Sequence, residues 1–194
     1  GLRGIFTSGA VDCFIDKEID FDYVVGVSAG ACNTFAYVAK QRGYGKACMI
    51  QKDRFDSYYG PLQAIDSHKL VDLDKIFYEY TVKYNFDYDR FPNSPIKWDM
   101  VVSNMRTGKA EYMKTRDLDR LRLIGKASCS LPIITDPVQL DDQLYLDGGI
   151  TDSIPIEHVL DKGFDKIVVV LTRKKGNYSH TNEATKVIVR RMYS

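Results

Sequence analysis

The sequence is poor in the residues that build metal centres and disulfide frameworks. Its 194 residues include four cysteines and three histidines, and Cys13, Cys32, Cys48 and Cys129 form no Cys-x-x-Cys pair. Zinc sites and disulfide scaffolds usually depend on such clusters. We therefore expect free thiols, no bound metal and a reducing, cytoplasmic compartment.

An excess of one charge and long apolar runs are also missing. The 27 Lys and Arg residues nearly balance the 26 Asp and Glu residues, which leaves a formal charge of +1. Nucleic-acid-binding domains usually carry a strongly basic surface, so we expect no nucleic-acid partner. The longest aliphatic run, residues 167–171, has five residues, whereas a membrane-crossing helix needs about 20. The 44% hydrophobic and 27% charged residues are typical of a globular protein.

The spacing of apolar residues predicts alternating helices and strands. The expected helices cover residues 5–19, 29–41, 46–55, 67–82, 117–126 and 156–161, and the expected strands cover residues 21–27, 98–104, 110–114, 143–146 and 166–172. This alternation indicates a three-layer α/β/α fold with a largely parallel central sheet. We expect residues 1–194 to form one domain. The chain begins inside a glycine loop and ends inside a helical pattern, so we expect a longer parent chain.

The most informative motif is Gly26-Val27-Ser28-Ala29-Gly30, a G-x-S-x-G sequence between a predicted strand and a predicted helix. In this context it predicts a nucleophile elbow, a tight turn that exposes the serine hydroxyl. Side chains two residues either side of Ser28 would collide, so we expect both glycines to be required. The turn also aims the N–H group of Ala29 at an oxygen that becomes negative during attack. The alternative is an ordinary strand-to-helix connection with two incidental glycines.

A serine nucleophile requires a proton acceptor, and Asp147 is the first candidate. It ends a predicted strand and precedes two glycines, which allow close approach to another backbone turn. Burial among Leu144, Leu146 and Ile150 would raise the pKa of its carboxyl and make it a better base. The alternative is an Asp-Gly turn without a catalytic role.

A Ser-His-Asp triad is a second arrangement that the residue order permits, with His158 or His180 as the base. Neither histidine is predicted at a strand end, where such a base is expected. His158 falls in an amphipathic helical stretch and His180 in a polar segment. We therefore expect both histidines to have other roles.

A second glycine loop, Gly1-Leu2-Arg3-Gly4, leads into the first predicted helix. Backbone N–H groups in such a loop can hold an anion. The loop by itself is compatible with the oxyanion of an acyl-transfer reaction and equally with the phosphate of a nucleotide.

Taken together, Gly-Leu-Arg-Gly, Gly-Val-Ser-Ala-Gly and Asp-Gly-Gly, in this order, resemble the patatin-like phospholipase family. The resemblance extends to Ala-Ser-Cys-Ser-Leu-Pro at residues 127–132, to residues 147–155 and to residues 168–173. It is greatest to bacterial, cytoplasmic-type members. Relative to that family, the chain is expected to lack the first strand and the C-terminal helical part.

The resemblance implies a lipid acyl hydrolase with a Ser-Asp dyad, a covalent acyl-enzyme and no cofactor. Ser28 matches the nucleophile and Asp147 the proton acceptor. The residues that match the oxyanion hole are Gly1, Arg3, Gly4 and Ala29. A non-catalytic lipid- or acyl-binding module on the same fold is the rival hypothesis.

The implied partner is a lipid or another acyl ester. Tyrosines at residues 78–88 and basic residues at 173–175 are compatible with a transient contact with a membrane surface. We therefore expect a cytoplasmic protein that is at most peripheral to a membrane. No oligomeric state follows from these patterns.

Overall fold

The structure is a computed structural model that describes residues 2–51, 56–60, 70–174 and 176. Within them the helices are α1 (Gly4–Asp16), α2 (Ala29–Val38), α3 (Tyr44–Met49), the π-helical turn η2 (Lys75–Glu79), α5 (Tyr80–Lys83), α6 (Arg90–Asn93), α7 (Leu118–Ser128), the 3-10 turn η3 (Gly148–Ile150) and α8 (Ile156–Asp161). The strands are β1 (Tyr23–Val27), β2 (Lys97–Asn104), β3 (Ala110–Met113), β4 (Val138–Leu140) and β5 (Gln143–Asp147).

The strands form one mixed sheet with β2 at its centre. β1 runs parallel to β2, whereas β3 and β5 run antiparallel to it, and β4 pairs antiparallel with β5. The β2–β3 and β4–β5 connections are short, and short connections join antiparallel neighbours. The strand β4 was not predicted from the sequence.

The register along β2 brings the ends of β1 and β5 together. Val101 pairs with both β1 and β3, and Val102 pairs with both β3 and β5. Because a strand has two edges, β1 and β5 share the edge of β2 opposite β3. Val27, the last residue of β1, pairs with Val101, and Asp147, the last residue of β5, pairs with Val102. The C-terminal ends of two strands therefore meet at consecutive residues of β2.

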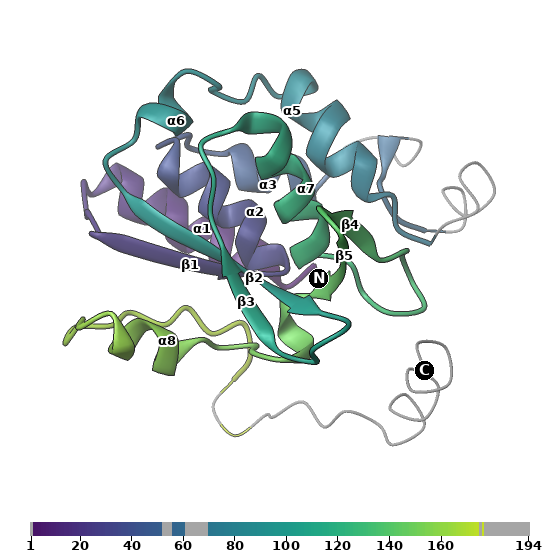
Figure 1. Cartoon of the computed structure of the whole chain (residues 1–194). Helices are drawn as coiled ribbons and strands as arrows, with labels where there is room; N and C mark the ends of the chain where they lie inside the picture. The colour runs from purple at the N-terminus through teal and green to yellow at the C-terminus, as the bar shows by residue number, and fades with distance from the viewer. Residues whose placement is uncertain (1, 52–55, 61–69, 175, 177–194) are drawn as a thin grey trace.

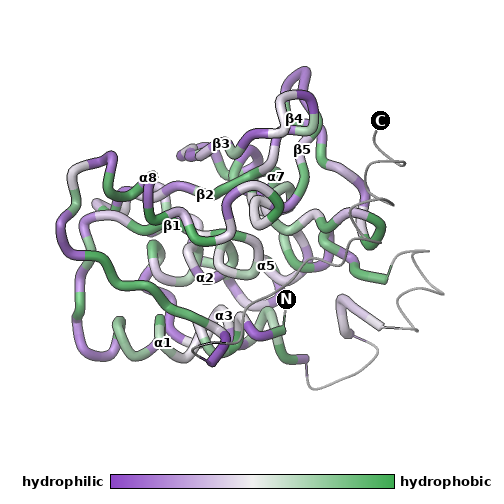
Figure 2. The backbone as a smooth tube through the Cα atoms, turned by 90° about the horizontal axis from the view of Figure 1, so that it is seen from below, coloured by the Kyte–Doolittle hydropathy of each residue, from purple (hydrophilic) through white to green (hydrophobic). Residues whose placement is uncertain are grey.

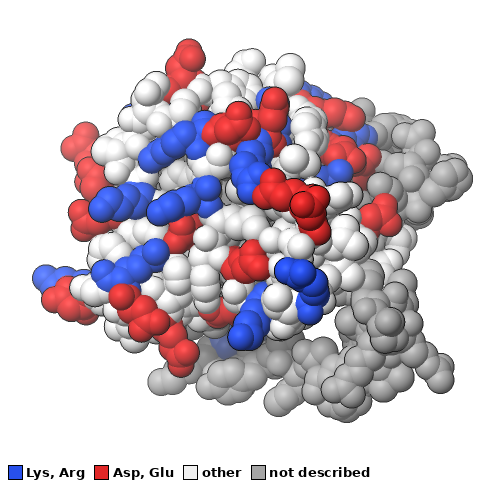
Figure 3. Space-filling view, in the orientation of Figure 1, with Lys and Arg blue, Asp and Glu red and all other residues white. Residues whose placement is uncertain are grey.

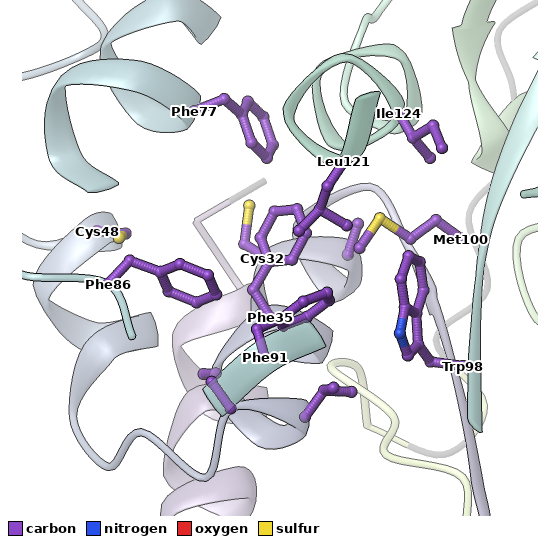
Figure 4. Packing of buried hydrophobic residues seen from close by; sticks show 14 of the residues in the cluster. Cys32, Phe35, Cys48, Phe77, Phe86, Phe91, Trp98, Met100, Leu121 and Ile124 are labelled. Atoms are coloured by element: carbon purple, nitrogen blue, oxygen red, sulfur yellow. The ribbon is translucent and has the colours of Figure 1, made fainter. Parts of the chain in front are cut away.

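Helices cover both faces of the sheet, which confirms the three-layer α/β fold. Among the described strands β1 and β2 pair in parallel and the other three pairs are antiparallel, so the sheet is mixed where the sequence predicts a largely parallel one. Alternate side chains of β2 point to opposite faces, and Trp98, Met100 and Val102 enter the main hydrophobic core. Figure 4 shows this core between β2 and the helices, with Phe35, Phe77, Phe86 and Phe91 among its members. Helix α8 lies on the other side of the sheet from α1 and α2 (Figure 1). Lys and Arg are interspersed with Asp and Glu over the face in Figure 3, so no single charge sign dominates it.

The strand predicted at residues 166–172 is wrong. These residues form neither helix nor strand, and Val168 and Leu171 are 60% and 54% exposed. Figure 2 shows the hydrophobic stretch leading into the grey C-terminal trace. A β-branched run becomes a strand when a neighbour pairs with it. Among the described residues, no strand pairs with the edge of β1 that faces away from β2.

The other predicted elements are found, the helix at residues 156–161 with its predicted ends and the rest with shifted ends. Helix α3 begins at Tyr44, and residues 52–55 of the predicted helix lie outside the described residues. Residues 67–69 also lie outside them, and the described remainder of that predicted helix contains η2 and α5. In this region Phe77, Tyr80, Phe86 and Phe91 are buried in the core, and Tyr84 and Tyr88 pack against it, so most of these rings are not free to contact a membrane surface. No described helix is long and apolar enough to span a membrane.

Candidate active site

The serine of the G-x-S-x-G motif occupies a strained turn between β1 and α2. Ser28 has φ 55° and ψ −126°, a region that residues other than glycine rarely adopt. A Cβ added to Gly26 would lie 2.3 Å from Oγ1 of Thr34 and 2.6 Å from the carbonyl oxygen of Gly30. The elbow therefore forms as the motif predicts, and Gly26 is required by packing.

The predicted steric requirement for glycine is wrong at Gly30. A Cβ added there would meet no atom within 4 Å, because this position in the first turn of α2 faces open space. The backbone of Gly30 closely approaches Gly26, so this contact requires glycine at position 26 and not at position 30.

Ser28 and Asp147 meet directly although they lie 119 residues apart in the sequence. The hydroxyl of Ser28 donates a hydrogen bond to Oδ2 of Asp147 at 2.6 Å. The Asp147 side chain belongs to a residue that is 2% exposed. Its other oxygen, Oδ1, accepts the N–H of Gly149 at 2.8 Å. Both carboxylate oxygens are therefore engaged, one of them by the elbow hydroxyl.

The backbone around Asp147 is held on both sides. Its N–H donates to the carbonyl oxygen of Ser130 at 2.7 Å, and its carbonyl oxygen accepts the hydroxyl of Ser103 at 2.8 Å. A Cβ added to Gly148 would lie 2.2 Å from the carbonyl oxygen of Val101. This residue must therefore be glycine for the chain to pass so close to β2, as the Asp-Gly-Gly sequence predicts.

Burial raises the pKa of the Asp147 carboxyl, and the hydrogen bonds from Ser28 and from the Gly149 N–H oppose this rise. The direction agrees with the sequence prediction, but the residues responsible differ. Leu146 is buried, whereas Leu144 and Ile150 are exposed. The carboxyl is buried instead by its place at the junction of β1, β2 and β5. A raised pKa makes the carboxylate a stronger base toward the hydroxyl beside it.

Two of the predicted oxyanion-hole residues lie next to each other. Gly4 begins α1 and Ala29 begins α2, and the first N–H groups of a helix have no acceptor within it. A Cβ added to Gly4 would lie 2.8 Å from Cβ of Ala29. The amide of Asn33 donates to the carbonyl oxygens of both residues, at 3.2 and 3.1 Å. The Asn33 side chain thus ties the two helix starts together, a role that the sequence did not reveal.

The remaining oxyanion candidates are placed less closely. Arg3 immediately precedes α1 and is exposed, and no hydrogen bond or ion pair joins its guanidinium to another described residue. Gly1 lies outside the described residues. Gly4 and Ala29 are therefore the members of the predicted set that the structure brings together.

His158 belongs to a separate cluster. Its Nε2 lies 3.0 Å from Oδ2 of Asp99 and 3.1 Å from the hydroxyl of Tyr23, and its ring stacks on Tyr112 at 3.5 Å. Lys162 also contacts Oδ2 of Asp99, at 3.2 Å. These contacts bind α8 to the sheet and keep the imidazole away from Ser28. His180, the other triad candidate, lies outside the described residues.

Ser128, like Asn33, contacts the site but was not predicted from the sequence. The backbone N–H of Ser28 donates to Oγ of Ser128 at 3.0 Å, and Ser128 is fully buried at the end of α7. The signal available was its position within the Ala-Ser-Cys-Ser-Leu-Pro segment. Among the described residues, no group of three or more His, Cys, Asp or Glu side chains is arranged to hold a metal ion.

The structure thus combines an α/β fold with an elbow serine that is hydrogen-bonded to a buried carboxylate. Comparison with known proteins identifies the family, because residues 1–160 match the model of the patatin-like phospholipase family. The chain is also 30% identical, over 190 aligned residues, to the uncharacterized protein YjjU of Escherichia coli K12. That alignment covers 89% of this chain and 49% of the relative, so the chain spans about half the length of the curated relative. The chain belongs to the patatin-like phospholipase family.

Proposed function

We propose that this chain is a lipid acyl hydrolase that uses Ser28 as nucleophile and Asp147 as proton acceptor. The observation that carries the proposal is the 2.6 Å hydrogen bond from the Ser28 hydroxyl to Asp147, without an imidazole between them. The buried carboxyl and its raised pKa support the role of Asp147 as a base.

The reaction follows from the positions of these groups. The Ser28 proton passes to Oδ2 of Asp147 while Oγ bonds to the acyl carbon of the ester, whose carbonyl oxygen becomes an oxyanion. The N–H groups of Gly4 and Ala29 are the proposed donors to that oxyanion. When the ester C–O bond breaks, Asp147 returns the proton to the leaving alcohol. Water then attacks the acyl-enzyme, again losing a proton to Asp147, and the acid is released as Ser28 regains its proton.

The test combines covalent labelling with hydrolysis of a short-chain ester. A fluorophosphonate probe should modify Ser28 of the wild-type chain, and Ser28→Ala should neither be labelled nor hydrolyse the ester. Asp147→Asn should be folded and nearly inactive. The matched control is Asp99→Asn, the same change at a carboxyl that is also buried, 3% exposed, but bonded to His158. It should remain active.

Each failure has a distinct meaning. A folded wild-type chain that the probe does not modify would favour a lipid- or acyl-binding module over an enzyme. Loss of activity in a folded His158→Gln variant would favour a Ser-His-Asp arrangement. Equal losses in Asp147→Asn and Asp99→Asn would remove the special role of Asp147.

We also propose that the substrate is met at a lipid surface. Exposed apolar side chains lie on the segments that carry the proposed site, before Gly4, in the first turn of α1, after Ser130 and after Gly149; they are Leu2, Phe6, Leu131, Ile133 and Ile150. Phe6 is the most exposed of the five, at 63%. Apolar side chains around a lipid-hydrolysing site favour a transient, peripheral contact with the bilayer.

A further inference from the structure

Ser28 is held by contacts with three different elements. Its carbonyl oxygen accepts the N–H of Ala31 in α2 at 2.8 Å. Its hydroxyl donates to Asp147 at the end of β5, and its N–H donates to Oγ of Ser128 at the end of α7. The elbow is therefore positioned by α2, β5 and α7 together.

The hydrogen bond from Ser28 to Ser128 helps to hold Ser28 in its strained conformation. A residue with φ 55° remains in that conformation only where its surroundings hold it. The N–H of Ser28 precedes α2, so the helix supplies no acceptor for it. The hydroxyl of Ser128 fixes the plane of the Val27–Ser28 peptide and with it the direction in which the nucleophile points.

Ser128 lies on a rigid support. Asp117 caps the N-terminus of helix α7, where its side chain accepts the N–H of Arg120 at 2.7 Å. The core side of the helix is formed by Ile124 and Ala127, both 0% exposed. Ser128 is also 0% exposed, so its hydroxyl cannot exchange the Ser28 N–H for bulk water without local opening.

The same turn of chain also holds Asp147. The carbonyl oxygen of Ser130 accepts the N–H of Asp147 at 2.7 Å. Residues 128–130 thus bond to both members of the proposed dyad, to the nucleophile through a side chain and to the acceptor through the backbone. The turn is itself closed by hydrogen bonds from the N–H of Cys129 to Lys126 and from the N–H of Ser130 to Ala127.

We infer that residues 128–130 set the spacing between Ser28 and Asp147, and that Ser128 is a positioning residue that acts through its hydroxyl. This inference rests on the proposed function. Removing the hydroxyl frees the Ser28 peptide to turn and takes the nucleophile out of line with Asp147 and the oxyanion donors. A displacement of about 1 Å at a reacting group typically costs on the order of a hundredfold in rate.

The test uses the full chain and three variants. Ser128→Ala should lower kcat for a soluble ester by about tenfold to a hundredfold, and it should leave KM unchanged. Ser128→Thr keeps the hydroxyl but adds a methyl group at a fully buried position, so it should lose thermal stability and still retain most of kcat. Ser94→Ala is the matched control, because Ser94 is also buried and its hydroxyl also accepts a backbone N–H, that of Ile96 at 3.4 Å. Its kcat should not change.

A second readout does not depend on turnover. Hydrogen exchange of the Ser28 amide, measured by NMR, should accelerate in Ser128→Ala and remain slow in Ser128→Thr and Ser94→Ala. Wild-type kcat in Ser128→Ala, or kcat values that follow thermal stability instead of the hydroxyl, would overturn the role of Ser128 alone. A folded wild-type chain without ester hydrolysis or probe labelling would instead overturn the proposed function on which the inference rests.

Discussion

Replacing Asp147 by asparagine should separate activity from stability. Asparagine has the same shape, so its Oδ1 can still accept the Gly149 N–H while its amide group replaces Oδ2 beside Ser28. The amide cannot take up the hydroxyl proton. We expect kcat to fall by about 10²- to 10⁴-fold, the contribution typical of a general base.

The stability of Asp147→Asn at neutral pH should rise, whereas its kcat falls. The folded-state pKa of Asp147 is raised, chiefly by burial, so its contribution to stability is fully present below the unfolded pKa and is lost as pH rises through the folded pKa. At neutral pH the buried carboxylate therefore costs stability, and asparagine removes that cost. Each pKa unit corresponds to about 1.4 kcal/mol. For a chain of this size, each kcal/mol shifts Tm by about 2–4 °C.

The assay is thermal unfolding of both proteins across the acid-to-neutral range, together with kcat for a soluble ester. The difference in Tm, variant minus wild type, should be near zero where Asp147 is protonated and become positive as it ionises. A variant that is inactive and less stable at neutral pH would refute this reasoning, because the loss of activity would then reflect a damaged fold. A variant with wild-type kcat would show that another group accepts the proton.

The wild-type kcat/KM should rise with pH through the raised pKa of Asp147, since only the carboxylate accepts a proton; a profile that stays flat where Asp147 ionises would contradict its role as the base. Gly148→Ala should lower the free energy of unfolding by about 1–3 kcal/mol, because its Cβ would lie 2.2 Å from the carbonyl oxygen of Val101. Gly30→Ala, whose Cβ meets nothing within 4 Å, should change it by less than about 0.5 kcal/mol, and similar losses in urea unfolding would refute the packing argument. Phe6→Glu should slow hydrolysis of phospholipid vesicles and leave soluble-ester hydrolysis unchanged, whereas equal effects on both substrates would argue against contact with a lipid surface.

Local sequence was a reliable guide where short-range geometry decides the conformation. A strand followed by G-x-S-x-G leaves few conformations for Ser28, and the structure has the strained turn that this motif predicts. The Asp-Gly-Gly sequence likewise predicts a close backbone approach, and in the structure Gly148 lies against the backbone of Val101. The prediction for Gly30 was wrong, because what an added Cβ would meet depends on the neighbouring elements rather than on the motif.

Predictions that depend on partners far away in the sequence were less successful. The apolar run at residues 166–172 has the composition of a strand, but pairing decides whether it forms one, and no described strand pairs with it. The burial of Asp147 was foreseen, but Leu144 and Ile150 were wrongly expected to provide it. Ser128 could not be assigned a role, because a buried serine at the end of a helix has no sequence pattern of its own.

By itself the sequence determined the chemistry at hand: a hydroxyl on a tight bend, a carboxyl before two glycines, and the family to which their order belongs. Only the tertiary structure decided that these two groups touch. The reason lies in the register of β2, where β1 and β5 end at Val101 and Val102 on one edge. Pairing between distant strands depends on the whole packed sheet, so no local pattern could have specified that meeting point.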